Sequence, residues 1–434
     1  MALALGILGL LALAGSLSAS VRMRHPAYLV GLVMFPSWLT SELAPFVLAS
    51  QIVVAAVLVA FGALSGTIGV VGLGAMAGSW LLLGFVIRRN GATPEVFAAA
   101  FAGVVGPEPR GLLPEERSGR LRTPSELSHL VNPLRFRPPG VETVRDIEYG
   151  PAGERNRLDV HRPSRGARTP RSPVVLQVHG GAWMIGRKDQ QGQPLVGHLA
   201  SRGIPSVAIN YRLAPRHRFP AQLVDVKRSI AWIRANAEIH GGDPDRIIVT
   251  GGSAGGHLAM IAALTADRPE LQPGFEGVDT SVVGCVPFYG PPDLRDRDRL
   301  RGRLASMEPM LKRLIMPGPP DRDPELWELG SPITLVRPDS PPFLVIHGSL
   351  DVLVYREEVR RFVDELRSVS RAPVLYAELP GAQHAFDVFR SYRCDAAVDA
   401  VHLFVELVDA GRLGAGSRPS DGPASLLGDD PAGS

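Results

Sequence analysis

The first part of the chain consists of long apolar runs, whereas the remainder alternates short apolar runs with amphipathic ones. Residues 2–19, 43–64 and 65–87 carry no charged residue. Each run has about the length of the ~20-residue helix that crosses the hydrocarbon layer of a membrane. A buried helix of a soluble domain normally keeps a polar face, and these runs have none. We therefore expect residues 1–89 to form a membrane anchor of about three transmembrane helices.

A fourth apolar stretch, residues 27–39, is shorter and contains Pro36. Because proline interrupts a helix and the stretch is too short to cross a bilayer, we expect an interfacial or re-entrant piece. Residues 90–140 are predicted to be a tether rich in Pro, Arg and Glu. The tether contains one predicted helix, residues 94–105, which lies either on the membrane or on the following domain.

From about residue 141 to 410 the pattern predicts alternating strands and helices. Continuous apolar strands that alternate with helices are typical of an α/β fold with a mostly parallel sheet covered on both faces. The first two strands leave no room for a helix between them, so we expect them to be antiparallel at one edge. The expected strands are residues 145–149, 156–163, 173–180, 204–211, 246–252, 281–290, 342–349 and 373–381, with helices at 195–203, 221–242, 255–266 and 355–370.

Two segments depart from this alternation. Residues 291–340 carry prolines, many charges and an amphipathic piece, residues 304–316. We expect them to form a cap-like insertion over the carboxyl edge of the sheet, with a plain surface loop as the alternative. Residues 411–434 are rich in Gly, Ser, Pro and Asp, and this composition predicts a disordered tail.

One Gly-x-Ser-x-Gly sequence, Gly251 to Gly255, lies between a predicted strand and a predicted helix. A strand-turn-helix context places a serine on a sharp exposed corner, where Gly251 and Gly255 remove side chains that would clash. The free N–H groups of the following helix point toward charge that develops beside the serine. Ser253 is therefore the candidate nucleophile, and a glycine-rich turn without chemistry is the alternative.

A serine hydroxyl becomes a good nucleophile when a base takes its proton and a carboxylate orients that base. Asp351 follows one predicted strand and His384 follows the next, so Ser253, Asp351 and His384 occur in the order expected on such a sheet. We interpret His347 as a packing residue at a strand end and His257 as a support for the helix after the serine.

A second motif, HGGAW at residues 179–183, follows another predicted strand. Its two glycines let the backbone turn its N–H groups toward one point. Together with the N–H of Ala254, these groups could bind the oxyanion of a tetrahedral intermediate. Taken alone, the motif is more often a simple turn.

Residues 141–410 resemble the hormone-sensitive-lipase-like branch of the α/β-hydrolase fold, whose esterases carry an HGGG-type oxyanion loop and a GxSAGG elbow. The motifs HGGAW, NYRLAP, GGDPDRI, GGSAGGHLA, HGSLDVLV and GAQHAF occur in the order of that family. The resemblance implies Ser253 as nucleophile, with Asp351 and His384 as its partners. It also implies an oxyanion site around the backbone of Gly180, Gly181, Ala182 and Ala254, with His179, Gly251 and Gly255 as supports of the motifs.

Ala182 departs from the family pattern, which often has a third glycine at this position. Since the chemistry uses only a backbone N–H, an alanine can serve where its dihedral angles permit. The membrane-attached N-terminus further resembles a subgroup of actinobacterial membrane carboxylesterases.

Charge and cysteine content exclude some other classes of protein. The chain has 46 Lys and Arg against 43 Asp and Glu, and stretches such as residues 293–303 interleave both signs, as a solvated surface does. We therefore expect no nucleic-acid partner. Cys285 lies in an apolar run and is expected to be a buried strand residue. With Cys394 as the only other cysteine, no disulfide framework is indicated.

The sequence thus predicts a membrane-anchored serine carboxylesterase that cleaves short to medium acyl esters through an acyl-enzyme. The expected partners are a small-molecule or lipid ester substrate and membrane lipid, and no metal or organic cofactor is required. The alternatives are an amidase of the arylformamidase type and a non-catalytic ligand-binding protein on a hydrolase scaffold. A third alternative makes the membrane segments primary, but uncharged spans offer no obvious transport path.

Basic residues at the ends of the predicted spans bear on topology. Arg22 and Arg24 follow the first span, and Arg88 and Arg89 follow the last. Two spans separate these pairs, so both lie on one side, and the positive-inside bias makes that side, with the catalytic domain, cytoplasmic at the plasma membrane. The alternative is that residues 1–20 are a cleaved signal peptide, which places the domain outside. The absence of a basic n-region favours an uncleaved helix.

Overall fold

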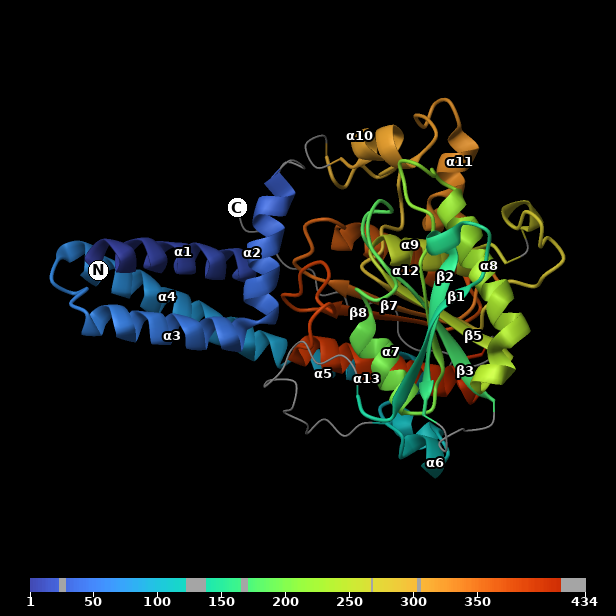
Figure 1. Cartoon of the computed structure of the whole chain (residues 1–434), viewed down its shortest axis with the longest axis horizontal. Helices are drawn as coiled ribbons and strands as arrows, with labels where there is room; N and C mark the ends of the chain where they lie inside the picture. Colours follow the sequence, from blue (N-terminus) through green and yellow to red (C-terminus); the bar gives the residue numbers. More distant parts are fainter. Residues whose placement is uncertain (23–28, 122–137, 165–170, 267, 303–305, 415–434) are drawn as a thin grey trace.

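The computed structural model describes residues 1–22, 29–121, 138–164, 171–266, 268–302 and 306–414. Figure 1 shows two parts: helices α1, α3 and α4 lie side by side in a bundle that projects from a domain built around one sheet. Helix α2 lies across the end of the bundle, next to the domain.

The N-terminal bundle contains the predicted apolar runs. Two helices are long and apolar enough to cross a membrane, and a bent pair, Met34–Glu42 with Ala44–Ala60, would add a third if it is one span. The bend between the members of this pair is 92°. The four helices are α1 (Ala2–Ser20), α2 (Val30–Glu42), α3 (Ala44–Ala60) and α4 (Thr67–Asn90).

Small residues bring α1 and α4 into direct backbone contact. A Cβ atom added to Gly9 would lie 2.1 Å from the carbonyl oxygen of Gly72. Nearby, the hydroxyl groups of Ser16 and Ser79 are 2.7 Å apart. Close small-residue contacts and hydrogen bonds between helices are typical of packing in apolar surroundings, where no hydrophobic effect drives helices together.

Helix α5 (Thr93–Val105) follows α4 and packs on the α/β domain. The side chains of Phe97 and Phe101 are buried in one cluster with Leu403 and other residues of the domain. Of the two placements left open for the predicted helix 94–105, the structure therefore shows the one on the domain. The tether continues through the short helices Pro109–Leu112 and α6 (Glu115–Ser118), and residues 122–137 lie outside the described part of the chain.

The domain contains an eight-stranded sheet in the order β1-β2-β4-β3-β5-β6-β7-β8. Strands β1 and β2 are antiparallel, as predicted for the first two strands, and β2 also pairs antiparallel with β4. The remaining pairs are parallel, which confirms the predicted α/β class. The strands are β1 (Val141–Glu148), β2 (Arg157–Pro163), β3 (Ser172–Val178), β4 (Ser206–Ile209), β5 (Gly242–Gly252), β6 (Gly284–Phe288), β7 (Phe343–Gly348) and β8 (Val374–Leu379).

Helices cover both faces of the sheet. Neighbouring strand residues point to opposite faces, so Val174 belongs to the core under α8, α9 and α12, whereas Val175 belongs to the core under α5, α7 and α13. The final helix, α13, follows the last strand and was not among the predicted helices. The helices are α7 (Gln193–Ser201), α8 (Ala221–Asn236), α9 (Ala254–Leu264), α12 (Arg356–Val369) and α13 (Tyr392–Asp409), with 3-10 turns at Gly153–Asn156, Ala237–His240 and Pro269–Leu271.

Between β6 and β7 the chain forms short helices instead of one long helix. The fully buried Trp327 donates its indole N–H to the carbonyl of Gly318 at 3.0 Å, and this contact folds the segment on itself. Gly330 of the same segment contacts His257 at the start of α9, where β5 ends. The short helices are α10 (Glu308–Met310), the π-turn Leu311–Ile315, α11 (Pro324–Leu329) and Pro332–Leu335. Most of the predicted disordered tail, residues 415–434, lies outside the described residues.

Candidate active site

Ser253 occupies the sharp corner between β5 and α9. Its φ of 56° and ψ of −121° lie in a region that residues with a side chain rarely adopt. A Cβ atom on Gly255 would lie 2.0 Å from the carbonyl oxygen of Val178, and one on Gly251 would lie 2.5 Å from the same atom. Only glycine fits at these two positions, so the motif lets the corner close against β3 and present the Ser253 hydroxyl at the end of the sheet.

The structure brings Ser253, His384 and Asp351 together from three different strand ends. Nε2 of His384 lies 2.8 Å from Oγ of Ser253, and Nδ1 of His384 lies 2.7 Å from Oδ2 of Asp351. The other carboxylate oxygen of Asp351 accepts the backbone N–H groups of Leu353 and Val354. Burial opposes ionisation of Asp351, but the charge and hydrogen bond of His384 hold its pKa below the usual range. The ionised carboxylate can accept the Nδ1–H of His384, which leaves Nε2 facing the serine.

In the described part of the chain, the ring nitrogens of His257 and His347 form no hydrogen bond with Ser253. The Nε2–H of His257 donates to the carbonyl of Gly330 at 2.8 Å, and its Nδ1 accepts the indole N–H of Trp183 at 3.2 Å. Burial lowers the pKa of His257 to about 4, so its ring is neutral at pH 7. His347 is also fully buried and bonds to the carbonyl of Val354 at 3.1 Å. Both therefore have the supporting positions expected from the sequence.

The HGGAW segment forms a tight loop beside Ser253. Gly181, Ala182 and Trp183 have φ angles of 112°, 51° and 60°. Across the described residues, no protein group accepts the backbone N–H groups of Gly181, Ala182 or Ala254. Gly180 differs, because its N–H already donates to the side-chain oxygen of Gln191 at 2.5 Å. Three of the four predicted oxyanion donors are thus free to bind a ligand, and the fourth is engaged.

His179 holds this loop in place. Its Nδ1–H donates to the carbonyl of Gly180 at 2.7 Å, and its ring stacks on Tyr211 with 4.3 Å between the centroids. The hydroxyl of Tyr211 in turn donates to the carbonyl of His179. Burial lowers the pKa of His179 to about 4, so the ring is a neutral support at pH 7.

Gln191, Tyr289 and Asp387, which were not predicted as site residues, connect the HGGAW loop to the loop that carries His384. Gln191 donates its amide N–H to the hydroxyl of Tyr289 at 3.0 Å, and that hydroxyl donates to Asp387. The ring of Tyr289 lies 4.6 Å from the ring of His384. Burial raises the pKa of Asp387 to about 6. The position of Tyr289 directly after β6 could have marked it, because functional side chains collect at the carboxyl ends of parallel strands.

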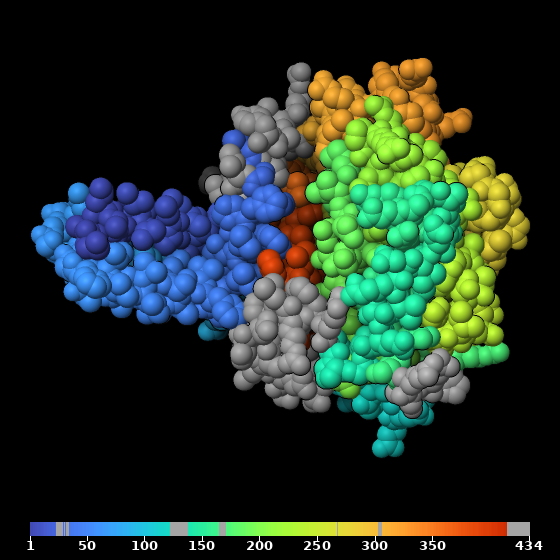
Figure 2. Space-filling model, in the orientation of Figure 1, coloured from blue at the N-terminus to red at the C-terminus, as the bar shows by residue number. Residues whose placement is uncertain are grey.

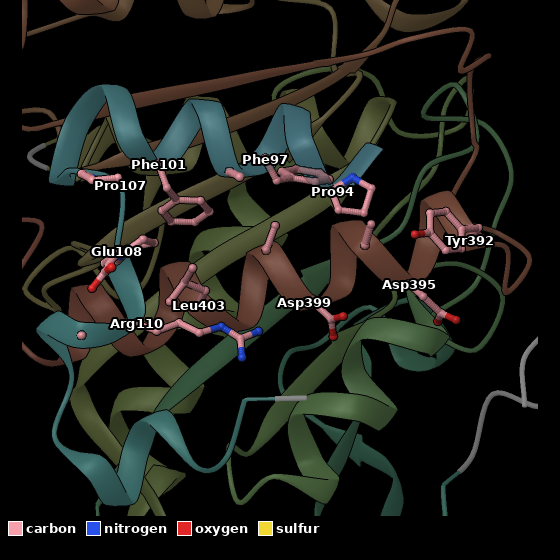
Figure 3. A pocket seen from close by; sticks show the side chains of 15 residues that line it. Pro94, Phe97, Phe101, Pro107, Glu108, Arg110, Tyr392, Asp395, Asp399 and Leu403 are labelled. Carbon is pink, nitrogen blue, oxygen red and sulfur yellow. The ribbon is translucent and has the colours of Figure 1, made fainter. Parts of the chain in front are cut away.

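A separate cavity of about 500 Å³ lies between α5 and α13, away from these residues (Figure 3). Phe97, Phe101 and Leu403 form its apolar wall, and Asp399 and Arg110 lie at its polar side. None of the predicted site residues lines it. Over the described ranges, no group of three or more His, Cys, Asp or Glu side chains is placed to hold a metal ion, and Cys285 and Cys394 are free and buried.

The sequences of known proteins match much of this chain. The BD-FAE family model matches residues 158–366. The chain is 46% identical over 283 residues to the probable carboxylic ester hydrolase LipM of Mycobacterium tuberculosis, a match that covers 65% of this chain and 64% of LipM. It is 41% identical over 330 residues to esterase LipQ of the same organism, which covers 74% of this chain and 76% of LipQ.

Solved structures give the same class of fold. A thermophilic esterase from the planctomycete Thermogutta terrifontis, Est2, is 25% identical with a TM-score of 0.51, and the match covers 64% of this chain and 96% of Est2. The sheet order, the serine elbow and the identity to LipQ across three quarters of both chains point to one conclusion. The chain belongs to the hormone-sensitive-lipase-like carboxylesterases of the α/β-hydrolase fold.

Proposed function

We propose that this carboxylesterase is a membrane-anchored serine enzyme that hydrolyses short to medium acyl esters through an acyl-enzyme. In this proposal Ser253 is the nucleophile, His384 is the base and Asp351 orients the base. The observation that carries it is the pair of hydrogen bonds, 2.8 Å and 2.7 Å, that joins the three side chains in that order. Such a chain of contacts is what activates a serine hydroxyl.

The reaction begins when Oγ of Ser253 attacks the ester carbonyl carbon while Nε2 of His384 takes the hydroxyl proton. The carboxylate of Asp351 stabilises the imidazolium that forms. The carbonyl oxygen becomes an oxyanion, which accepts the free N–H groups of Gly181, Ala182 and Ala254. Collapse of the intermediate expels the alcohol, which receives the proton from His384, and leaves an acyl-serine.

Water then completes the cycle by the same route. His384 takes a proton from the water as its oxygen attacks the acyl carbon, and the same N–H groups bind the second oxyanion. Collapse releases the carboxylic acid and returns the proton to Oγ of Ser253. The relatives are named as esterases and a carboxylic ester hydrolase, which supports an ester rather than an amide substrate.

The N-terminal helices would anchor this enzyme in a membrane. Large apolar side chains of α1 and α4 are exposed, among them Leu3 (64%), Leu11 (64%) and Leu81 (79%), and hydrocarbon would cover them. Contact of α1 with α4 through Gly9 and Gly72 supports retention of α1 over its loss as a signal peptide. Arg88 and Arg89 lie in the last turn of α4, and by the positive-inside bias they support a cytoplasmic position of the catalytic domain.

Labelling with a fluorophosphonate followed by peptide mapping tests the chemistry. The expected label lies on Ser253. The Ser253→Ala variant should take up no label and lose ester hydrolysis because it lacks the attacking hydroxyl, while its fold stays native because the backbone elbow is unchanged. An acyl-chain series of chromogenic esters then defines the preferred chain length. Hydrolysis at the native rate by Ser253→Ala would overturn the proposal.

A further inference from the structure

The loop that carries His384, between β8 and α13, is held from outside by the N-terminal part of the chain. Trp38 of α2 donates its indole N–H to the carbonyl of Ala385, the residue after His384, at 2.9 Å. The Trp38 ring also stacks on Phe389 of the same loop, with 5.0 Å between centroids and 22° between planes. Figure 2 shows α2 in blue directly beside the red C-terminal part of the chain, which reaches this face only in a narrow band.

The residue before His384 is held in the same way. Gln383 donates its side-chain N–H to the hydroxyl of Ser37 at 3.0 Å, and this hydroxyl donates to the carbonyl of Ser18 in α1 at 2.8 Å. Helix α2 therefore contacts both neighbours of His384 in sequence. The Ala385 carbonyl receives one further N–H, from Val388 within the loop, at the longer distance of 3.3 Å.

A buried charge pair fixes both ends of the loop to α2. Arg393 at the start of α13 pairs with Glu42 at the end of α2, and both side chains are 0% exposed. Arg393 also donates to the carbonyl of Pro380 at 3.0 Å, where the loop begins. Ser391, where the loop ends, donates to the other oxygen of Glu42 at 2.9 Å. Removal of either charge would leave the other buried and unpaired, which is strongly destabilising, so the anchor and the loop depend on each other at this contact.

We propose that Trp38 is a positioning residue for His384, so that helix α2 of the anchor completes the catalytic site. The inference rests on the proposed role of His384 as the base. Asp351 fixes the plane of the imidazole ring, but the distance from Nε2 to Ser253 also depends on the backbone at residues 383–385. That backbone has an unusual conformation, since Ala385 has a φ of 61°, and the Trp38 N–H satisfies its carbonyl.

The geometry also links the placement of His384 to the anchor as a whole. Helix α2 turns by 92° into α3, and α4 reaches the same region through Asn90, which donates to the carbonyl of Ser41 at 3.0 Å. A shift of the bundle relative to the domain would therefore move Trp38 and, with it, the loop of the base. A displacement of about 1 Å at a reacting group can slow a reaction by about 100-fold.

Variants of the full-length chain in one detergent test the proposal. Trp38→Phe keeps a ring against Phe389 and removes the N–H donor, whereas Trp38→Ala removes both. We expect kcat for a chromogenic ester to fall about 10-fold in Trp38→Phe and about 100-fold in Trp38→Ala, with KM unchanged. The matched control is Trp80→Phe in α4, because the indole N–H of Trp80 has no partner among the described residues. Its kcat should equal that of the native chain.

Fluorophosphonate labelling separates positioning from folding. The final fraction of labelled chains counts the intact sites, whereas the labelling rate reports activation of Ser253. We expect a native final fraction with a slower rate in both Trp38 variants. A native kcat in both variants, or a lower final fraction with a native rate, would overturn the positioning role.

His384→Ala in the same preparation distinguishes this failure from that of the proposed function. If His384→Ala is inactive while both Trp38 variants are fully active, only the role of Trp38 is wrong. If His384→Ala itself hydrolyses the ester at the native rate, the proposed function fails and the inference about Trp38 fails with it.

Discussion

The ring of Tyr289 lies 4.6 Å from the ring of His384, and its hydroxyl accepts an N–H from Gln191, which contacts the proposed oxyanion loop, residues 179–183. Gln191 donates to this hydroxyl and accepts the N–H of Gly180. Tyr289 in turn donates to Asp387, three residues after His384. One chain of hydrogen bonds thus joins the loop that would bind the oxyanion to the loop that would supply the base.

Removal of the Tyr289 hydroxyl should therefore disturb both loops at once. Tyr289→Phe keeps the ring against His384 but removes the hydroxyl that pairs with the part-buried Gln191 amide and the buried Asp387 carboxyl, at a cost of about 1–3 kcal/mol of stability. We expect kcat for ester hydrolysis to fall about 10-fold through misplacement of the reacting groups. Tyr376→Phe is the matched control, since its hydroxyl bonds to Glu378 on β8. Equal kcat in the two variants would contradict a role for the chain of hydrogen bonds.

Ser253, His384 and Asp351 should contribute unequally to kcat. His384→Ala is expected to cost nearly as much kcat as Ser253→Ala, because a serine without its base gains little from the rest of the unit. Asp351→Asn should retain more activity, since the carboxylate orients and stabilises without exchanging the proton. The measurement is kcat per folded chain, with the folded fraction taken from circular dichroism and size-exclusion chromatography in the same detergent, because a chain without its base is not expected to react with the fluorophosphonate. His347→Ala serves as control, and a loss as large as that of His384→Ala would show that the base is wrongly assigned.

The local features of this fold were predictable from the sequence, and the long-range ones were not. Most strands could be recognised from the sequence as short apolar runs, although β1 carries four charged residues among eight. The elbow at Ser253 could be recognised from its glycines, because Gly251 and Gly255 lie too close to the backbone of Val178 for a side chain. Helix α5 could not be placed from its pattern, because an apolar face suits a membrane and a protein surface equally. Its burial through Phe97 and Phe101 decided the question.

Helix α13 was not predicted from the sequence, because both its polar and its apolar residues are buried. Arg393, His402 and Glu406 are at most 2% exposed, so the sequence does not alternate as it does in a surface helix. The contact of Trp38 with Ala385 could not be predicted for another reason, since 347 positions separate the two residues. Contacts over such distances depend on how the anchor docks on the domain, which no local pattern records.

The oxyanion loop allows a test with opposite outcomes at adjacent positions. Ala182 has a φ of 51°, which glycine adopts more readily than alanine, so Ala182→Gly should keep its N–H in place and retain kcat within about 3-fold. Gly181→Ala should nearly abolish activity, because φ at Gly181 is 112° and a Cβ atom there would lie 2.2 Å from the carbonyl oxygen of Ile185. Chromogenic ester hydrolysis and the rate of fluorophosphonate labelling measure both effects. High activity in Gly181→Ala would contradict this loop geometry.

The buried carboxyl of Asp387 should make stability depend on pH in an unusual direction. Burial raises its pKa from 3.8 to about 6, although its contacts with Tyr289 and His384 oppose the shift. Between these two values the folded chain holds a proton that the unfolded chain has lost, so the contribution of this group to stability falls as pH rises from about 4 to 6 and stays low above 6. The penalty is on the order of 3 kcal/mol at most.

Asp387→Asn should remove this penalty, because an amide cannot ionise and its oxygen still accepts the Tyr289 hydroxyl. We expect the variant to melt a few degrees above the native chain at pH 8, at about 2–4 °C per kcal/mol, with the difference vanishing near pH 4. Thermal scans at one fixed rate in the same detergent measure it. The matched control is Asp339→Asn, whose side chain is 74% exposed beside Arg337 and should give no such pH-dependent gain. A Tm difference for Asp387→Asn that is the same at pH 4 and pH 8 would mean that Asp387 does not titrate in this range.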